Sequence, residues 1–330
     1  IKNSIKIDAS LNEEDWKNVP IAKNFVMFNQ ENGKPELPEL RTEVKVVYDD
    51  DAIYVGAILY DNEPSKILRE ISERDDIRAA DFFGVFINGF NDGQQEFSFF
   101  VSASDGQMDL VRTTENEDTS WDAIWESKAK ITDIGWVVEM KIPYAALRFS
   151  EEEKQTWGIN FFREVRRNRQ MFTWNPVDNS KGFFTQQAGI LKGIEKINTP
   201  TRLFLIPYSS FYLNSLGKDK SFGTLKGGLD LKYGLTDAFT LDMVLIPDFG
   251  QTRFDNKILN LGPFEQILNE NRPFFTEGTD LFNKGGLFYS RRIGQRASKY
   301  PEISETEEVI DFPSTIDLVN AVKVSGRTKD

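Results

Sequence analysis

The 330-residue chain contains no cysteine and no histidine. Their absence excludes thiolate and imidazole metal ligands, Ser-His-Asp catalysis and histidine-ligated haem. We therefore expect no zinc and no haem, and we predict no catalytic residues. Without cysteine, no disulfide can report the compartment. The sequence also lacks any apolar run near the ~18 residues of a membrane-spanning helix, although the strands of a membrane β-barrel leave no such run.

The negative charge is concentrated in the first part of the chain. Residues 1–200 carry 24 Lys/Arg and 35 Asp/Glu, a net charge of −11, whereas residues 201–330 carry 16 and 17, a net charge of −1. An acidic unit argues against nucleic acid or anionic lipid as its partner, because phosphate binding relies on positive charge. The length and the uneven charge predict two structural units.

Residues 1–198 are predicted to form an antiparallel β-sandwich. Strand-like runs recur at residues 44–48, 53–59, 82–87, 97–101, 136–142 and 157–163. The sequence Asn91-Asp92-Gly93 between two of these runs is a strong hairpin signal. Many short strands with few helices are typical of an all-β sandwich.

The order of several motifs in this unit resembles the family-nine carbohydrate-binding module. The motifs are Asp8, Leu11, Glu13 and Trp16, then Tyr48-Asp49-Asp50 and Ile53-Tyr54-Val55, then Trp121-Asp122 and Trp125, then Gly135-Trp136, Glu139 and Ile142-Pro143. The resemblance covers nearly the whole first unit. It implies a β-sandwich that binds the ends of sugar chains between two tryptophans and often carries structural calcium.

Exposed aromatic and polar side chains are the expected components of a sugar site. Pyranose rings stack their C–H faces on flat aromatics, and their hydroxyls need charged or amide partners. The candidate carbohydrate-binding residues are Trp121, Trp125, Trp174, Arg163 and Glu139. The alternatives are that the tryptophans pack in the core, and that Arg163, Arg166 and Arg167 are a solvated run or partners of the surplus carboxylates.

Clustered acidic residues are candidate calcium ligands, since calcium prefers oxygen donors. These candidates are Asp75, Asp76, Asp81 and Asp92. Their spacing does not match that of a specific calcium-binding loop, so the alternative is that they form a solvent-exposed acidic turn. Related sequences, in which a family-nine-like domain precedes a membrane β-barrel, usually have Asp at the position of Asn88. The difference weakens a role for that strand end in binding a metal ion or a sugar hydroxyl.

Residues 199–330 follow a strict alternation that predicts the first strands of an outer-membrane β-barrel. Leu225, Leu229 and Leu231 share one face of a strand, while Lys226 and Lys232 share the other. Charges at every second position suit an aqueous lumen behind a lipid-facing surface. An ordinary sheet with one wet face is the alternative. Residues from about 248 to 314 are predicted to be a long loop or a plug-like segment.

A second resemblance concerns the segment from Pro247 to Gly294. Its motifs Pro247-Asp248-Phe249-Gly250-Gln251, Asn271-Arg272-Pro273-Phe274-Phe275 and Ser290-Arg291-Arg292-Ile293-Gly294 are similar to those of outer-membrane proteins in which a family-nine-like domain precedes a barrel. The stretch 252–257 departs from that pattern. The resemblance implies a place in the Gram-negative outer membrane with the first unit in the periplasm. Four strands cannot close a barrel, so we expect a piece of a longer protein.

The sequence favours a non-catalytic glycan-binding domain linked to an outer-membrane barrel that serves uptake, export or assembly. Its expected partners are an oligosaccharide, outer-membrane lipid and other envelope proteins. One alternative is a glycoside hydrolase-associated protein of carbohydrate catabolism, although no catalytic carboxylate pair can be selected. The other is a structural, partner-binding component of an outer-membrane complex.

Overall fold

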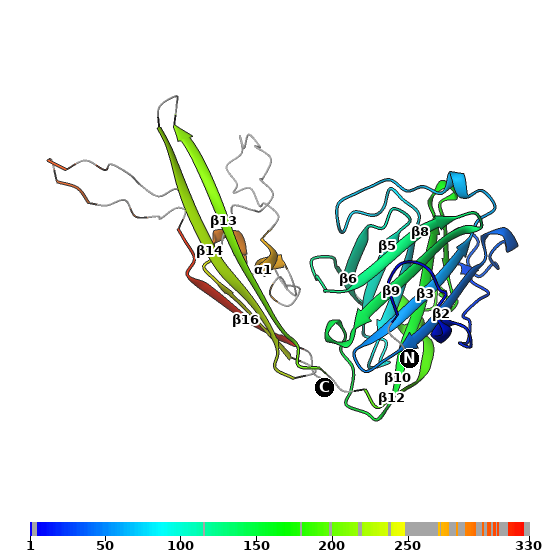
Figure 1. Cartoon of the computed structure of the whole chain (residues 1–330). Helices are drawn as coiled ribbons and strands as arrows, with labels where there is room; N and C mark the ends of the chain where they lie inside the picture. The colour runs from blue at the N-terminus through cyan, green and yellow to red at the C-terminus, as the bar shows by residue number, and fades with distance from the viewer. Residues whose placement is uncertain are drawn as a thin grey trace. The chain divides into compact units, whose positions relative to one another are not determined.

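The computed structural model describes residue 1, residues 5–197 without 115 and 179, residues 200–247 without 217–219 and 237–238, parts of 270–309, and residues 316–326. The chain divides into two compact units, Ile1–Thr201 and Arg202–Asp330. Strands dominate both units, which confirms the prediction of an all-β protein (Figure 1).

Two antiparallel sheets form the N-terminal unit. The larger sheet has the strand order β1-β11-β10-β4-β5-β6-β7, and β12 also pairs with β10; the smaller has the order β2-β3-β9-β8. The larger sheet contains β1 (Val26–Met27), β4 (Phe82–Asn88), β5 (Gln95–Ser102), β6 (Gln107–Thr113), β7 (Glu117–Asp118), β10 (Lys154–Val165), β11 (Gln170–Thr173) and β12 (Gly189–Glu195). The smaller contains β2 (Thr42–Tyr48), β3 (Ala52–Tyr60), β8 (Glu126–Thr132) and β9 (Gly135–Pro143). The short helices are η1 (Glu14–Trp16), η2 (Pro38–Leu40), η3 (Pro64–Lys66), η4 (Tyr144–Ala146), η5 (Arg166–Asn168) and η6 (Phe184–Gln187).

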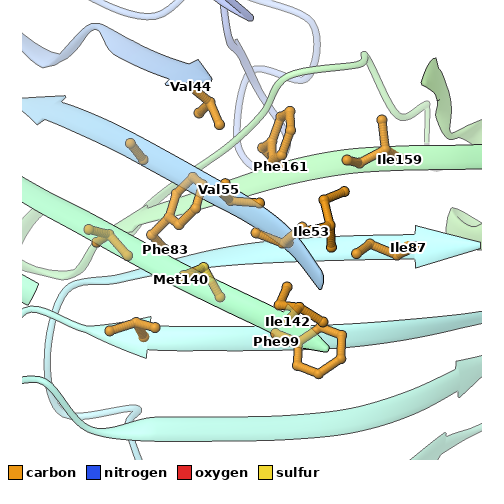
Figure 2. Packing of buried hydrophobic residues seen from close by; sticks show 14 of the residues in the cluster. Val44, Ile53, Val55, Phe83, Ile87, Phe99, Met140, Ile142, Ile159 and Phe161 are labelled. Carbon is orange, nitrogen blue, oxygen red and sulfur yellow. The ribbon is translucent and has the colours of Figure 1, made fainter. Parts of the chain in front are cut away.

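The core lies between these two sheets. Ile53 and Val55 from β3 and Phe83 and Ile87 from β4 belong to one buried cluster, and Figure 2 shows them within the same packed layer. Alternate residues of each strand enter this layer, as the pleat of a strand requires. The predicted β-sandwich is therefore confirmed.

The N-terminal segment covers the outer face of the smaller sheet. Trp16 is fully buried there, and its indole Nε1 donates to a carboxylate oxygen of Glu139 at 3.3 Å. The same carboxylate accepts from the backbone N–H groups of Asp8 and Ala9 at 2.9 and 3.0 Å. Gly56 on β3 permits the close approach, because a Cβ at that position would lie 2.6 Å from the side chain of Leu11.

The second unit contains a four-stranded antiparallel sheet of order β13-β14-β15-β16. These strands are β13 (Leu203–Leu216), β14 (Lys220–Gly234), β15 (Phe239–Leu245) and β16 (Asn320–Gly326), and the short helices are α1 (Pro273–Thr276) and η9 (Ser290–Arg292). β13 and β16 each have one strand partner among the described residues, so the predicted barrel stays a prediction. No α-helix in the part of the chain that the structure describes is long and apolar enough to cross a bilayer.

The two faces of this sheet differ as the alternation predicts. Leu205, Leu231, Met243 and Val322 lie side by side on one face, and Leu225 on the same face of β14 is 76% exposed. The opposite face carries the buried side chains of this sheet, which are Asp242, Val244 and Lys323 among the described residues.

Part of the polar face is covered by the segment around α1. Lys323 on β16 is buried, lies 3.6 Å from the Asp242 carboxylate and donates to the backbone oxygen of Phe274. Arg272 is also buried, and it donates to Glu270 and to the backbone oxygen of Ser290. Most of the predicted loop at about 248–314 lies outside the described residues.

Candidate functional site

A pocket of about 700 Å³ opens on the outer face of the larger sheet. Six buried side chains of β4, β5, β6 and β10 that point away from the core line it: Phe82, Phe86, Phe100, Phe162, Met108 and Leu110. Phe28, Met171, Phe183 and Phe184 also line it, and we call the whole the Phe pocket. Its volume lies in the range of small-molecule sites, and its lining is mostly apolar.

The aromatic rings are fixed by one another and by the sheet. Phe86 and Phe184 lie with ring centroids 4.9 Å apart, and Phe82 stacks on Phe162 at 5.7 Å. Gly84 makes room for Phe100, because a Cβ at that position would lie 2.5 Å from the phenyl ring. The pocket is therefore a preformed aromatic surface.

Polar side chains gather at one end of the pocket around Arg112 on β6. The guanidinium lies 4.5 Å from the ring centroid of Phe184 and 5.1 Å from that of Phe86, which are cation–π distances. It pairs with Glu117 at 2.7 Å and approaches Glu96 at 3.7 Å. Burial raises the pKa of Glu96 to about 8, against the opposing effect of Arg112.

The predicted tryptophans do not line this pocket. Trp125 is buried, and its indole Nε1 donates to Asp109 at 2.7 Å. Trp121 and Trp174 are half-buried and pack against the core, with ring centroids 5.1 Å from Phe97 and 5.6 Å from Phe161. Trp125 follows the alternative in which the tryptophans pack in the core, whereas Trp121 and Trp174 keep part of their surface exposed, so their role in sugar binding stays a prediction.

The structure also buries the side chains of Arg163 and Glu139 inside the N-terminal unit. Arg163 has no exposed surface, and its guanidinium donates to Thr42 Oγ1 at 3.1 Å and to the backbone oxygen of Tyr60 at 2.8 Å. Glu139 is buried under the N-terminal segment. The expectation that these two side chains face a sugar is corrected, because protein groups surround both.

The neighbouring arginines follow the alternative in which they pair with carboxylates. Arg167 makes a bidentate pair with Asp61 at 2.7 and 2.9 Å, and Arg166 pairs with Glu164 at 2.8 Å. The Arg167 pair ties the end of β10 to the segment after β3, whereas the Arg166 pair is local to β10 and Arg166 itself is exposed.

The phenylalanines of the pocket were missed by the sequence analysis although a signal was present. Consecutive phenylalanines occur at 82–83, 99–100 and 161–162. Since neighbouring residues of a strand point to opposite faces, one member of each pair must leave the core. An outer face with that many aromatics predicts a covered or ligand-binding surface.

Residues 7–181 match the family described as Carbohydrate family 9 binding domain-like. The chain belongs to this family. Residues 199–330 match a domain of unknown function, DUF5916. No curated protein matches the sequence.

Two solved structures of a family 9 carbohydrate-binding module from Caldicellulosiruptor kristjanssonii are similar to the family 9 domain in fold. The complex with cellotriose is 17% identical with a TM-score of 0.42, and the alignment covers 59% of this chain and 96% of that one. The complex with glucose is 18% identical with a TM-score of 0.42, covering 60% and 96%. Neither likeness is close enough to transfer a ligand.

Of the predicted calcium ligands, only Asp75 joins a carboxylate cluster in the described part of the family 9 domain. One oxygen each from Asp75, Asp109 and Asp122 lies within 4.8 Å of the others. Oxygen donors suit calcium. The cluster already contains a cation, since Arg74 lies 2.7 Å from Asp109 and 3.4 Å from Asp122.

The other three predicted ligands bond to protein groups elsewhere. Asp81 is buried and accepts from the backbone N–H of Arg166 at 3.0 Å. Asp92 accepts from Asn88 and from the backbone N–H of Gln94 in the β4–β5 turn. Asp76 lies exposed, in a turn closed by its backbone N–H and the carbonyl of Glu73. These positions do not form one site, which corrects the expected grouping.

Proposed function

We propose that the first unit is a non-catalytic glycan-binding domain whose ligand lies in the Phe pocket. The observation that carries this proposal is a preformed aromatic pocket with charged groups among its lining residues, in a domain of a carbohydrate-binding family. Sugar rings present apolar C–H faces to aromatic rings and hydroxyls to charged groups, so the pocket offers both kinds of partner.

The carboxylates that line the pocket each pair with an arginine. Glu117 is held by Arg112 at 2.7 Å and Glu164 by Arg166 at 2.8 Å. A glycosidase needs one carboxyl group that keeps a proton and a second that acts as base or nucleophile. The contacts of these two carboxylates do not assign the two roles, so glycoside hydrolysis remains the alternative.

Calorimetric titration of the chain with cello-, malto-, xylo- and mannotetraose tests the proposal. We expect at least one of them to bind, without release of reducing ends. Phe184→Ala should weaken that binding by about 10-fold, because a buried phenyl contact contributes ~1.5 kcal/mol or more. Phe184 is half-buried at the pocket, so its loss leaves the core of the sandwich intact.

Ile134→Ala is the matched control for Phe184→Ala. Ile134 is 53% exposed between β8 and β9 and does not line the pocket. Its removal should leave the affinity unchanged. If none of the four tetrasaccharides binds, the glycan proposal fails and the structural, partner-binding alternative gains.

We further propose that the second unit places the chain in the outer membrane, as part of a β-barrel, with the family 9 domain in the periplasm. The exposed apolar face of β13 to β16 and the covered polar face support this arrangement. Leu205, Phe211 and Leu213 on β13 are 55%, 68% and 70% exposed, and lipid is the solvent that favours such a face.

Leu225→Arg tests the lipid contact. A charge on the lipid face costs about 2–4 kcal/mol at mid-bilayer depth. In Gram-negative cells that produce the protein, we expect Leu225→Arg to reduce the amount in the outer-membrane fraction. Thr224→Arg is the control, because Thr224 points to the opposite face of β14. Equal behaviour of the two variants would argue against a lipid-facing sheet.

We also propose that the N-terminal unit binds calcium, with the carboxylates of Asp75, Asp109 and Asp122 as its ligands. The oxygen donors support it, and Arg74 competes with it. Thermal unfolding in the presence of calcium and in the presence of a chelator shows whether calcium or Arg74 is the cation of the cluster. A melting temperature raised by calcium in the native chain but not in Asp75→Asn supports the ion, and an unchanged value leaves Arg74 as the cation of the cluster.

A further inference from the structure

One of the two arginines that line the Phe pocket has no carboxylate to compensate its charge. The charged side chains of the lining are Arg78, Arg112, Glu117 and Glu164. Arg112 pairs with Glu117 at 2.7 Å. Glu164 pairs at 2.8 Å with Arg166, which is not part of the lining. Among the residues that the structure describes, none forms an ion pair or a hydrogen bond with the side chain of Arg78.

Arg78 lies at the end of the pocket opposite to Arg112. The backbone N–H of Asp75 donates to the carbonyl of Gln107, the first residue of β6, at 3.0 Å. Ile77 is buried in one cluster with the phenylalanines of the pocket, so this segment brings Arg78 to the end where β6 begins. Arg112 lies near the other end of β6, roughly 16 Å from Gln107 at the rise of an extended strand.

The side chain of Arg78 is accessible to a ligand. It is exposed and lines the pocket. A guanidinium carries five N–H donors and no acceptor, and its fork matches a carboxylate with two parallel hydrogen bonds. The apolar rings beside it leave less water to screen its charge than an open surface does, which strengthens the attraction to an anion.

The acidic character of the domain does not remove this attraction. Residues 1–200 carry a net charge of −11, which repels an anion at a distance. Salt limits the repulsion, because the Debye length is about 8 Å at physiological ionic strength. Inside the pocket, the two lining carboxylates are each neutralised by an arginine of their own. Arg78 is therefore the uncompensated charge that a bound ligand meets.

We infer that the Phe pocket binds an acidic sugar, a uronic acid unit whose carboxylate pairs with Arg78 while its ring lies on the phenylalanines. This inference rests on the proposed glycan binding and adds the chemical class of the glycan. A uronic acid unit has a carboxylate in place of the hydroxymethyl group of the neutral sugar, and it keeps the apolar C–H faces that aromatic rings contact. It therefore matches both the rings and the uncompensated arginine.

Two pairs of tetrasaccharides that differ only in this group test the inference by calorimetric titration. They are tetramannuronate with mannotetraose, and tetraglucuronate with cellotetraose, each pair with the same β-linkage. In at least one pair we expect the acidic member to bind the native chain about 10-fold more tightly. Arg78→Gln should bring the affinities of that pair to within about twofold of each other, whereas Arg78→Lys keeps the charge and should retain most of the preference.

Arg69→Gln is the matched control. Arg69 is also exposed and lies in the same segment between β3 and β4, but it does not line the pocket. We expect its preference for the acidic sugar to stay within about twofold of the native value. Equal affinities for the acidic and the neutral sugar in both pairs, or a preference that survives Arg78→Gln, would overturn the inference and leave the glycan proposal standing. If neither the acidic nor the neutral sugars bind the native chain, the proposed function fails and the inference fails with it.

Discussion

Replacing Arg163 with leucine is expected to lower the free energy of unfolding by about 3–5 kcal/mol, the cost of breaking a buried charge network by removing one partner. The Arg163 guanidinium is fully buried and reaches from β10 to the backbone oxygen of Tyr60 and the hydroxyl of Thr42 in the smaller sheet. Leucine fills part of the space but leaves these acceptors unpaired between the two sheets.

The loss also affects the carboxylates around Arg163. Asp61, Asp81 and Glu36 lie close enough for Arg163 to stabilise their negative charge. Arg167 still pairs with Asp61 after the substitution, whereas Asp81 and Glu36 each lose one of the groups that stabilise their negative charge. We therefore expect the effect to exceed that of hydrogen bonds alone.

Urea unfolding followed by tryptophan fluorescence measures this effect. Lys154→Leu is a suitable control, because Lys154 lies on the same strand but is 75% exposed and pairs with Glu195 at the surface. Surface pairs of this kind contribute about 0–1 kcal/mol. A loss for Arg163→Leu no larger than that for Lys154→Leu would contradict a structural role for the guanidinium.

The stability of the chain is expected to fall as the pH rises from 5 to 9. Burial raises the pKa of Glu96 to about 8 and that of Glu36 to about 7, and it raises the pKa values of Asp81 and Asp109 to about 6. The folded state binds these protons more tightly than the unfolded state. The contribution of these four groups to the free energy of unfolding is therefore complete below about pH 4. It is lost as each group ionises in the folded state between about pH 6 and 8.

The expected loss between pH 5 and pH 9 is about 3 kcal/mol or more, since each unit of pKa difference corresponds to ~1.4 kcal/mol. Urea unfolding at a series of pH values measures it. In Glu96→Gln the decline above pH 7 should be much smaller, because it lacks the group with the highest raised pKa, whose ionisation is opposed by its burial and by Glu117. A native chain with the same stability at pH 5 and pH 9 would contradict the ionisation of buried carboxyl groups.

The strands of the sandwich could be predicted because alternation is a local property. The run 157–163 placed Trp157, Ile159, Phe161 and Arg163 on one face, and that face is the core. The position of Arg163 in this pattern indicated burial, whereas its charge suggested the surface. The strand position predicted the burial of Arg163 correctly and its charge did not, because acceptors on the opposite sheet stabilise the buried guanidinium.

The burial of Glu139 could not be read from its own strand. Its position on β9 points away from the core, and it becomes buried only because residues near position 10 fold back over it. The Phe pocket depends in the same way on residues from five strands and two loops. The alternation along a strand predicts the face to which each phenylalanine points. It does not predict which phenylalanines from different strands and loops come into contact.

The bonds from Glu139 to Asp8, Ala9 and Trp16 span 123 to 131 residues of chain. The segment around Asp8 and Ala9 can therefore make these bonds only after β9 has been synthesised. Contacts of such long sequence separation form late, because chain closure costs entropy before the contact is gained. We therefore expect the N-terminal segment of this domain to dock after β9 has formed, and its release would expose the indole of Trp16.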